Sequence, residues 1–407
     1  MIDAHRAEQS TRLFTTGERN GARSTRRVVP PPVRAGDDGP LSIGIIAPPW
    51  VPVPPPVYGG TELVVDNTAR GLMAAGHDVR LFATGDSTCP VPKRWLHDKA
   101  VGNIGSMIDE LGHVQAAYEE LADVDVIHDH TIFGPLWAKA VKARPVVVTT
   151  NHGPFSGELH GLYQAVSEYL SVIAISHHQA STASDVRIAD VIHHGLDVDR
   201  LPVGPGDGGY ALFLGRMAPS KGVHRAIDVA RAAGKKLVIA AKMWEQAERD
   251  YFAAEVEPRL GPHAEYIGEV GGMEKCELIG RAEALVNPIR WPEPFGLVMI
   301  EALAAGTPVL AFPEGAAPEI VDDGVTGHLC TDEDDMAARL AGIDALDRSA
   351  CRAAVEARFS TRAMVDNHLR LYRRLLTARR QVERLPSVMN PPTSIETFLD
   401  GYRATSA

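Results

Sequence analysis

The 407-residue sequence predicts an α/β protein with two doubly wound, Rossmann-like parallel-sheet domains that face a central cleft. Three observations predict this fold. Buried strands and amphipathic helices alternate twice along the chain, which favours parallel strands joined by helical crossovers. A stretch rich in Gly, Pro and Asp, "VIHHGLDVDRLPVGPGDGG", separates the two series and indicates a linker. Glycines and charged residues gather where strands end and helices begin, which is where open α/β sheets bind ligands.

The first series begins with a buried strand at 41–49, a proline-rich loop and a helix at 61–76 with Thr61 as the expected N-cap. Gly76 ends this helix, as glycine commonly does just past a helix C-terminus. The elements that follow are a strand at 77–85, a helix at 106–121, a strand at 124–130, a helix at 134–143, a strand at 144–153, a helix at 159–170 and a strand at 171–176.

The second series repeats the alternation after the linker. Its elements are a strand at 210–217, a helix at 221–233, a strand at 235–241, a helix at 245–257, a strand at 264–270, a helix at 273–282, a strand at 284–289, a helix at 295–305, a strand at 308–312, a helix at 317–322, a strand at 327–330 and helical structure over 333–380. A further helix is predicted near 393–404.

The chain therefore divides into four predicted segments. Residues 1–40 hold seven arginines and a PPP run without an apolar stretch, so we expect a disordered tail. An organellar transit peptide is the weaker alternative, because acidic residues interrupt the segment. Residues 41–203 form the N-terminal domain and 208–380 the C-terminal domain, followed by a C-terminal tail at 381–407.

Composition narrows the class of protein. With 45% hydrophobic and 23% charged residues, the chain is typical of a soluble globular protein. Its formal net charge of −11 argues against a nucleic-acid partner, because a surface that follows phosphates needs excess Lys and Arg. Four scattered cysteines without a CxxC pair favour a reduced, cytoplasmic protein. The sequence contains no run of 18 apolar residues, so we expect no transmembrane helix. Peripheral contact with a membrane remains an alternative.

The stretch "WPEPFGLVMIEALAAGTPVLAF" carries the strongest functional signal. Two prolines keep the chain extended before the helix predicted at 295–305. The first amides of such a helix have no partner inside it, so they suit an anion such as a phosphate. Glu293 lies at the mouth of this site, and Glu301 lies one turn into the helix, where it can accept hydrogen bonds from adjacent hydroxyls. The alternative is a capped core helix with two solvated glutamates.

Three shorter motifs point to the same kind of ligand. "YGGT" brings the backbone of Gly59 and Gly60 to a helix N-terminus. "LGRMAPSKG" places Arg216 and Lys221 around one loop, where two cations can neutralise a diphosphate without a metal. "NHG" places His152 at a strand end that faces the cleft. Taken singly, each motif has an ordinary alternative. YGGT also fits a tight turn, the two cations of LGRMAPSKG fit surface charges, and NHG fits a structural histidine.

Several histidines are ambiguous from sequence alone. "HDH" puts His128 and His130 on one strand face with Asp129 between them. No third and fourth ligand follow at a suitable spacing, so we assign no metal there and interpret this strand end as a weak candidate for the acceptor side. The pairs 177–178 and 193–194 allow the same two interpretations.

In combination these motifs resemble a known family. "GG" after the first strand, "GRMAPSKG", "YIGEV" and "EPFGLVMIEALAAGTPVLAFPEGAAPEIVDDGVTGHL" resemble the retaining glycosyltransferases of family 4, which have the GT-B fold. "VIHHGLDVDRL" is similar to that family's "IPNGVD" linker, with His194 where Asn is usual. The resemblance covers about residues 41–375. One departure is "IAAKMW" at 239–244, where the family often has a glycine after the strand.

The resemblance implies roles on a nucleotide-sugar donor, with a UDP- or GDP-sugar favoured. Glu301 would hold the ribose, Glu293 would contact the transferred sugar, and His152 would approach the same sugar. Arg216 and Lys221 would bind the diphosphate. The remaining donor-binding groups would be Gly59 and Gly60 near the phosphates, the amides of Phe295, Gly296 and Leu297 near sugar and diphosphate, and Gly268 to Val270 along the base.

The implied reaction transfers a sugar with retention of configuration, and without a metal or another cofactor, to a small molecule, glycan or lipid. The family's last helix crosses back onto the N-terminal domain, and the helix near 393–404 is the candidate for this. A GT-B sugar-nucleotide binding protein, or a related sugar-nucleotide enzyme without transferase activity, is the alternative. An NAD-linked oxidoreductase is disfavoured because GxGxxG with its distal acid is missing from the sequence.

Overall fold

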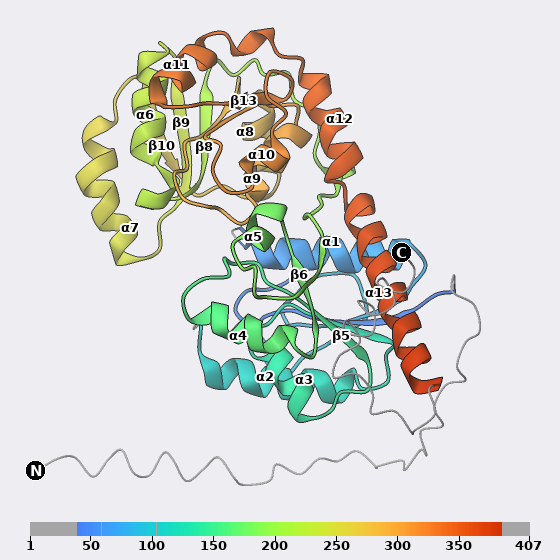
Figure 1. Cartoon of the computed structure of the whole chain (residues 1–407). Coiled ribbons are helices and arrows are strands. Elements are labelled where there is room, and N and C mark those ends of the chain that lie inside the picture. Colours follow the sequence, from blue (N-terminus) through green and yellow to red (C-terminus); the bar gives the residue numbers. More distant parts are fainter. Residues whose placement is uncertain (1–38, 58, 103, 385–407) are drawn as a thin grey trace, which may run out of the picture. The chain divides into compact units, whose positions relative to one another are not determined.

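The structure, a computed structural model, describes residues 39–57, 59–102 and 104–384. The two predicted α/β domains are present, each with its own parallel sheet (Figure 1). Most of the predicted N-terminal tail and the helix predicted near 393–404 lie outside the described residues. In the part of the chain that is described, no helix is long and apolar enough to cross a membrane.

The N-terminal domain has a seven-stranded sheet. Its strands are β1 (Ser42–Ile46), β2 (Asp78–Phe82), β3 (Lys93–Arg94), β4 (Val126–Asp129), β5 (Val146–Thr150), β6 (Ser171–Ala174) and β7 (Ile188–Val191). Its helices are α1 (Gly60–Ala74), α2 (Met107–Glu120), α3 (Gly134–Ala140), α4 (Glu158–Ser167) and α5 (His177–Ser181).

The C-terminal domain has a six-stranded sheet. Its strands are β8 (Ala211–Arg216), β9 (Leu237–Lys242), β10 (Ala264–Gly268), β11 (Leu285–Asn287), β12 (Val309–Ala311) and β13 (Gly327–Leu329). The helices of the second half of the chain are α6 (Val223–Ala232), α7 (Gln246–Tyr251), α8 (Gly272–Arg281), α9 (Leu297–Ala304), α10 (Ala317–Ile320), α11 (Glu333–Ala341), α12 (Arg348–Arg358) and α13 (Thr361–Arg384).

Strand order decides where ligands can bind. The sheets run β3-β2-β1-β4-β5-β6-β7 and β10-β9-β8-β11-β12-β13, and every paired strand is parallel. The order reverses direction between β1 and β4 in one sheet and between β8 and β11 in the other. Crevices at such switch points, beyond the carboxyl ends of the strands, are the usual ligand sites of doubly wound sheets.

Both faces of the first sheet are buried, as a parallel sheet requires. Ile45 of β1 packs in a cluster with residues of α1 and α13, whereas the next residue, Ile46, packs in a cluster with residues of α2 and α3. Successive side chains of a strand point to opposite faces, so one apolar strand supplies both cores. This explains why the strands appear in the sequence as continuous apolar runs.

The last described helix, α13, returns to the N-terminal domain. Its residues Val365 and Tyr372 belong to the same hydrophobic core as Ile45. Gly71 of α1 permits the close approach, because a Cβ there would lie 2.7 Å from Cγ2 of Val365. The sequence-based boundaries assigned residues up to 380 to the C-terminal domain, whereas the structure packs those from Thr361 onward on the N-terminal domain.

A few elements differ from the expected ones. β3, α5 and β7 were not predicted; they have two, five and four residues, and such short elements carry little periodicity. The N-cap of α1 is Gly59 and not Thr61. The helix expected over 245–257 is α7 followed by a π-helical stretch at Phe252–Val256.

Candidate active site

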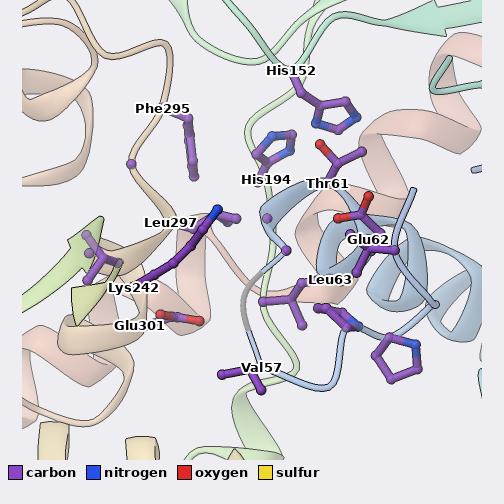
Figure 2. Close-up of a pocket in the computed structure, with 18 of the residues that line it drawn as sticks. Val57, Thr61, Glu62, Leu63, His152, His194, Lys242, Phe295, Leu297 and Glu301 are labelled. Carbon is purple, nitrogen blue, oxygen red and sulfur yellow. The ribbon is translucent and has the colours of Figure 1, made fainter. Parts of the chain in front are cut away.

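A cavity of about 950 Å³ is lined by loops of both domains. The N-terminal domain contributes the loop between β1 and α1 and the residues just after β4 and β5. The C-terminal domain contributes the ends of β8, β9 and β11 together with the first turns of α9. These are the loops at the two switch points, so the strand order itself assembles this site. Figure 2 shows Thr61 and Glu62 of α1 on one side and Phe295, Leu297 and Glu301 on the other.

The N-terminus of α9 opens into this cavity. Gly296 is its N-cap, with a left-handed φ of +102°, and no side chain caps the helix. The left-handed conformation itself favours glycine here, and a Cβ would in addition lie 2.5 Å from Cε of Met299, at the movable end of that side chain. Across the cavity a Cβ at Gly60 would lie 3.2 Å from Cδ1 of Leu297. The glycine loop and the open helix end therefore face each other closely, which suits a bound phosphate.

Lys221 and Glu293 form an ion pair at the cavity wall. The Nζ atom of Lys221 lies 2.5 Å and 2.7 Å from the two carboxylate oxygens of Glu293. Their side chains are 17% and 19% exposed, so the pair remains accessible to a ligand. Two residues that the sequence predicted from separate motifs are thus joined in one charged unit.

A second ion pair joins α8 to α9, where Lys275 donates to Glu301 over 2.7 Å. Both residues line the cavity. Burial opposes the charge on Lys275, but the neighbouring Glu301 carboxylate outweighs it and raises the pKa of the lysine. Glu301 therefore has a cation fixed beside it at the cavity.

Arg216 is not at the cavity, in contrast to the expectation that it binds a diphosphate there. Its Nε lies 3.4 Å from Glu248, whose buried carboxylate caps the start of α7. A buried carboxylate needs a charged partner, and Arg216 supplies one. Lys242, which is paired with Arg216 on the adjacent strand β9, does line the cavity (Figure 2).

His152 lies at the cavity, as predicted from the NHG motif. Its Nε2 lies 2.8 Å from Nδ1 of His130, and its ring stacks 5.1 Å from that of His194. The loop is held in place by Gln179, whose Nε2 donates to the carbonyls of Asn151 and Gly153 over 2.9 and 2.6 Å. His152 is therefore positioned from both sides.

These histidines are held neutral. Burial lowers the pKa of His152 to about 4, and it lowers the pKa of His130 and His194 well below the ordinary value. The neighbouring histidines reinforce the effect on His130 and His194 because each would repel another positive charge. At neutral pH, His152 can act toward a sugar hydroxyl as a hydrogen-bonding group without charge.

Of the three residues of the HDH motif, which were expected together on the acceptor side, His130 lines the cavity and His128 and Asp129 do not. His128 is fully buried; its Nε2 lies 2.7 Å from Oγ1 of Thr150 and its Nδ1 lies 2.8 Å from the hydroxyl of Tyr372. Asp129 is also buried and accepts hydrogen bonds from Tyr118 and Thr131. Asp129 points to the opposite face of β4 from the two histidines. Of these two, Tyr372 of α13 covers His128, whereas His130 lies just past the end of the strand.

Glu62, in the first turn of α1, is a cavity residue that the sequence analysis missed. It is 6% exposed, and burial raises its pKa to about 7. Its position two residues after Gly60 was the available signal. Lys242 and Lys275 were also missed, because a lysine at a strand end or on an amphipathic helix looks like a surface residue in sequence.

The other predicted donor-site residues have the following positions. Val270, Phe295, Gly296, Leu297, Gly59 and Gly60 line the cavity. Gly268 does not; it ends β10 with φ +89°, and Glu269 and Val270 reach the cavity instead.

Family models and curated relatives match both halves of the chain. The family model described as "Glycosyl transferases group 1" matches residues 203–358, and "Glycosyltransferase Family 4" matches 58–200. A phosphatidyl-myo-inositol mannosyltransferase of Mycobacterium leprae is 26% identical over 319 residues, which cover 71% of this chain and 83% of that protein. A glycogen synthase of Mycobacterium tuberculosis is 28% identical over 356 residues, with 73% and 83% covered.

Solved structures give the same fold. AviGT4, a glycosyltransferase involved in avilamycin A biosynthesis, matches with a TM-score of 0.64 and 26% identity over 83% of this chain and 98% of its own. A sucrose-phosphate synthase from Thermosynechococcus elongatus matches with a TM-score of 0.68 and 22% identity, over 83% and 100%.

Proposed function

Because this chain belongs to the family 4 glycosyltransferases of the GT-B fold, which act on nucleotide sugars, we propose that it is a retaining, metal-independent hexosyltransferase. The observation that carries the proposal is the cavity that joins the open N-terminus of α9 to two lysine–glutamate pairs and a neutral histidine. The proposed donor is a hexose carried on UDP or GDP. The acceptor is a small molecule, a glycan or a lipid.

The diphosphate is proposed to bind between Lys221 and the first amides of α9. Breaking the sugar–phosphate bond increases negative charge on the departing nucleoside diphosphate, and fixed cations and helix amides stabilise such charge. Gly59 and Gly60 allow the first domain to approach these phosphates. Lys242 would add a further positive charge from β9. Arg216 would contribute only after leaving Glu248.

The transferred sugar is proposed to lie between Glu293 and His152, which come from opposite domains. When the donor binds, Lys221 would turn from Glu293 toward the phosphate, and Glu293 would then accept hydrogen bonds from sugar hydroxyls. The uncharged His152 would hydrogen-bond to the same sugar. Groups from both domains would thus be needed at one substrate, so catalysis would require the domains to approach each other.

The nucleoside is proposed to lie deeper, with Glu301 accepting from the ribose hydroxyls and Val270 beside the base. No side chain is assigned as a covalent nucleophile. Retention would follow if the acceptor attacks from the face that the phosphate leaves, with a phosphate oxygen taking the acceptor proton. Water excluded by the closed cavity could not compete with the acceptor.

A donor screen tests this function. Purified full-length protein is incubated with UDP-, GDP- and ADP-hexoses without acceptor, and release of the nucleoside diphosphate is measured. We expect slow release from one donor, together with a rise in Tm with the same donor, because binding to the folded state stabilises it. A protein that is stabilised by a donor but never releases the diphosphate, with or without any acceptor, would be a binding protein. The anomeric configuration of the product decides between retention and inversion.

A further inference from the structure

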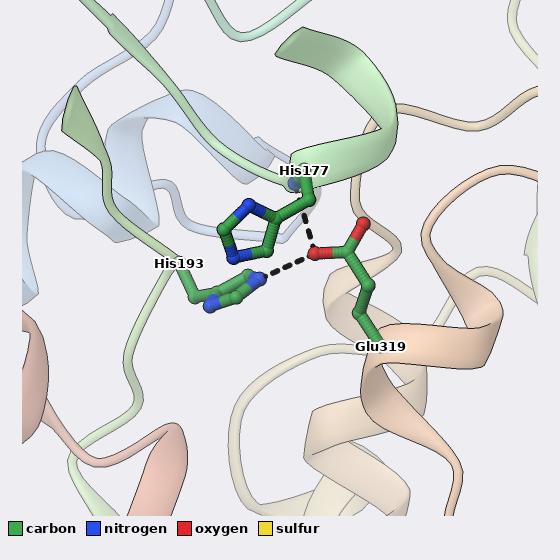
Figure 3. A group of neighbouring side chains, drawn as sticks. All are labelled: His177, His193 and Glu319. Atoms are coloured by element: carbon green, nitrogen blue, oxygen red, sulfur yellow. Dashed lines mark hydrogen bonds and ion pairs between the residues drawn. The ribbon is translucent and has the colours of Figure 1, made fainter. Parts of the chain in front are cut away.

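A cluster of potential metal ligands lies outside the proposed donor site. The side chains of His177, His193 and Glu319 offer ligand atoms that all lie within 4.8 Å of one another (Figure 3). Among the described residues, this is the only group of three or more His, Cys, Asp or Glu side chains with that property. The group borders a second hollow, separate from the donor cavity, that opens to solvent at His177.

The cluster joins the two domains. His177 begins α5 and His193 follows β7 in the N-terminal domain, whereas Glu319 is on α10 of the C-terminal domain. His193 Nε2 lies 2.7 Å from Oε2 of Glu319, and the carboxylate also accepts from the backbone amides of His177 and His178 over 2.9 and 2.7 Å. These bonds hold Glu319 in one orientation, so the carboxylate is preorganised for a ligand.

We propose that His177, His193 and Glu319 bind a divalent transition-metal ion such as Zn²⁺, and that the bound ion ties the two domains together. Two ligands on one Zn²⁺ at about 2.0–2.1 Å lie roughly 3.3 Å apart in a tetrahedron. The existing separations, from 2.7 Å up to at most 4.8 Å, bracket that value. Movements of the ligand atoms by about an ångström would therefore complete the site, with water as the fourth ligand.

The donor set decides the class of ion. Two imidazoles and one carboxylate suit Zn²⁺ and its transition-metal neighbours, whereas Mg²⁺ and Ca²⁺ prefer oxygen ligands. The Glu319 carboxylate is directed at the two histidines by hydrogen bonds from His193 and from the amides of His177 and His178. The nearby Arg358 is paired with Asp322 over 2.7 Å, which reduces its repulsion of a cation.

The site is adjacent to the donor cavity. The ring of His193 lies 5.8 Å from that of Phe295, which lines the cavity next to Gly296. Oγ of Ser176, beside His177, donates to the carbonyl of Pro294 over 2.6 Å. An ion that fixes His177 and His193 to Glu319 would hold this boundary in one arrangement. It would slow the domain movement of the proposed catalytic cycle, so the bound ion acts as a reversible inhibitor.

Calorimetry with tag-free, chelator-stripped full-length protein tests the binding. We expect one Zn²⁺ per wild-type chain and a higher Tm with Zn²⁺. His177→Gln and His193→Gln should each weaken binding by at least the roughly 10- to 100-fold that loss of a supporting hydrogen bond costs a metal site. His160→Gln is the matched control, because His160 pairs with Asp185 on the surface of the same domain. Its affinity should equal that of the wild type.

Three outcomes would overturn the proposal. Equal Zn²⁺ affinity in the wild type and in the His177→Gln/His193→Gln double variant would show that the ion binds elsewhere. No binding by the wild type, whose fold is confirmed by its Tm, would remove the site altogether. If Zn²⁺ binds here but leaves kcat unchanged at saturating donor, the tie between the domains is wrong. The first two outcomes are independent of the donor, because Zn²⁺ binding and Tm are measured without it.

Discussion

Lys221 and Glu293 are 72 positions apart in the chain, and yet Nζ of the lysine lies within 2.7 Å of both carboxylate oxygens of the glutamate. One charge comes from a short 3-10 helix after β8 and the other from the loop before α9. A ligand phosphate would compete with Glu293 for Lys221, and a sugar hydroxyl would compete with Lys221 for Glu293. The pair therefore stands where the sugar–phosphate bond of the proposed donor would break.

Lys221→Met should lower kcat by roughly 10²–10³, the effect of removing one group that stabilises developing negative charge. Arg216→Met should cost clearly less, about tenfold at most, because Arg216 must first give up Glu248. Steady-state kinetics of both variants with one donor make the comparison. Equal losses would show that Arg216 enters the cavity during turnover.

Glu301→Ala should mainly raise the donor KM. The ribose does not change during the reaction, so its contacts with the protein are equally strong in the ground state and in the transition state. A charged hydrogen bond contributes about 1.5–3 kcal/mol, which corresponds to roughly a 10- to 100-fold rise in KM. Lys275→Met should change KM in the same direction, because Lys275 donates to Glu301. A fall in kcat at constant KM for Glu301→Ala would contradict the placement of the ribose.

Gly296→Ala should reduce both stability and activity. An alanine with a left-handed φ costs about 1–2 kcal/mol, and here its Cβ would also push against Met299. Gly306→Ala is the matched control at the other end of α9. Gly306 also has a left-handed φ, +76°, but it does not line the cavity. Thermal unfolding should show losses for both variants, whereas turnover should fall only for Gly296→Ala.

Glu62 should make the protein less stable as the pH rises. Burial raises its pKa from 4.5 to about 7, so the folded state favours the protonated carboxyl. Its stabilising contribution is fully present below about pH 4.5 and is lost as the pH rises through 7, a change of about 3 kcal/mol. Glu62→Gln should therefore have a higher Tm than the wild type at pH 8, with a smaller difference at pH 5. Glu158→Gln, in the exposed first turn of α4, should show no such trend.

Turnover should persist in the presence of a chelator. In the proposed donor complex, Lys221, Lys242 and the amides of α9 would provide the positive charge that a metal would otherwise supply to the diphosphate. The assay compares initial rates with and without EDTA, followed by addition of Mg²⁺ or Mn²⁺. Loss of activity that either ion restores would show that catalysis requires a metal.

Much of the fold was predictable from the sequence because it depends on local signals. The apolar stretches within residues 41–49 and 144–153 indicate strands, and Gly76 and Gly306 end helices where glycine is favoured. The short edge elements β3 and β7 escaped prediction because none of their residues is fully buried, so they leave no apolar pattern.

The candidate site was predictable in part. Lys221, Glu293, Glu301 and His152 occur in motifs where a strand meets a helix, and all four line the cavity. Arg216 shares a motif with Lys221 but points to Glu248, which lies 32 positions further along the chain. Lys275 belongs to no motif and lines the site only because α8 packs beside it, whereas Glu62 directly follows the YGGT motif and was overlooked.

The sequence by itself determined the two parallel-sheet domains, the linker between them and the residues at their strand ends, since periodicity and backbone preferences act over a few neighbouring positions. Only the tertiary structure decided how charges pair, which histidines are buried and which domain covers His128. Pairing such as Lys221 with Glu293, and the closure of His128 by Tyr372 from α13, depends on groups far apart in the chain. Coulomb energy and burial depend on distance in space, which a pattern of adjacent residues does not record.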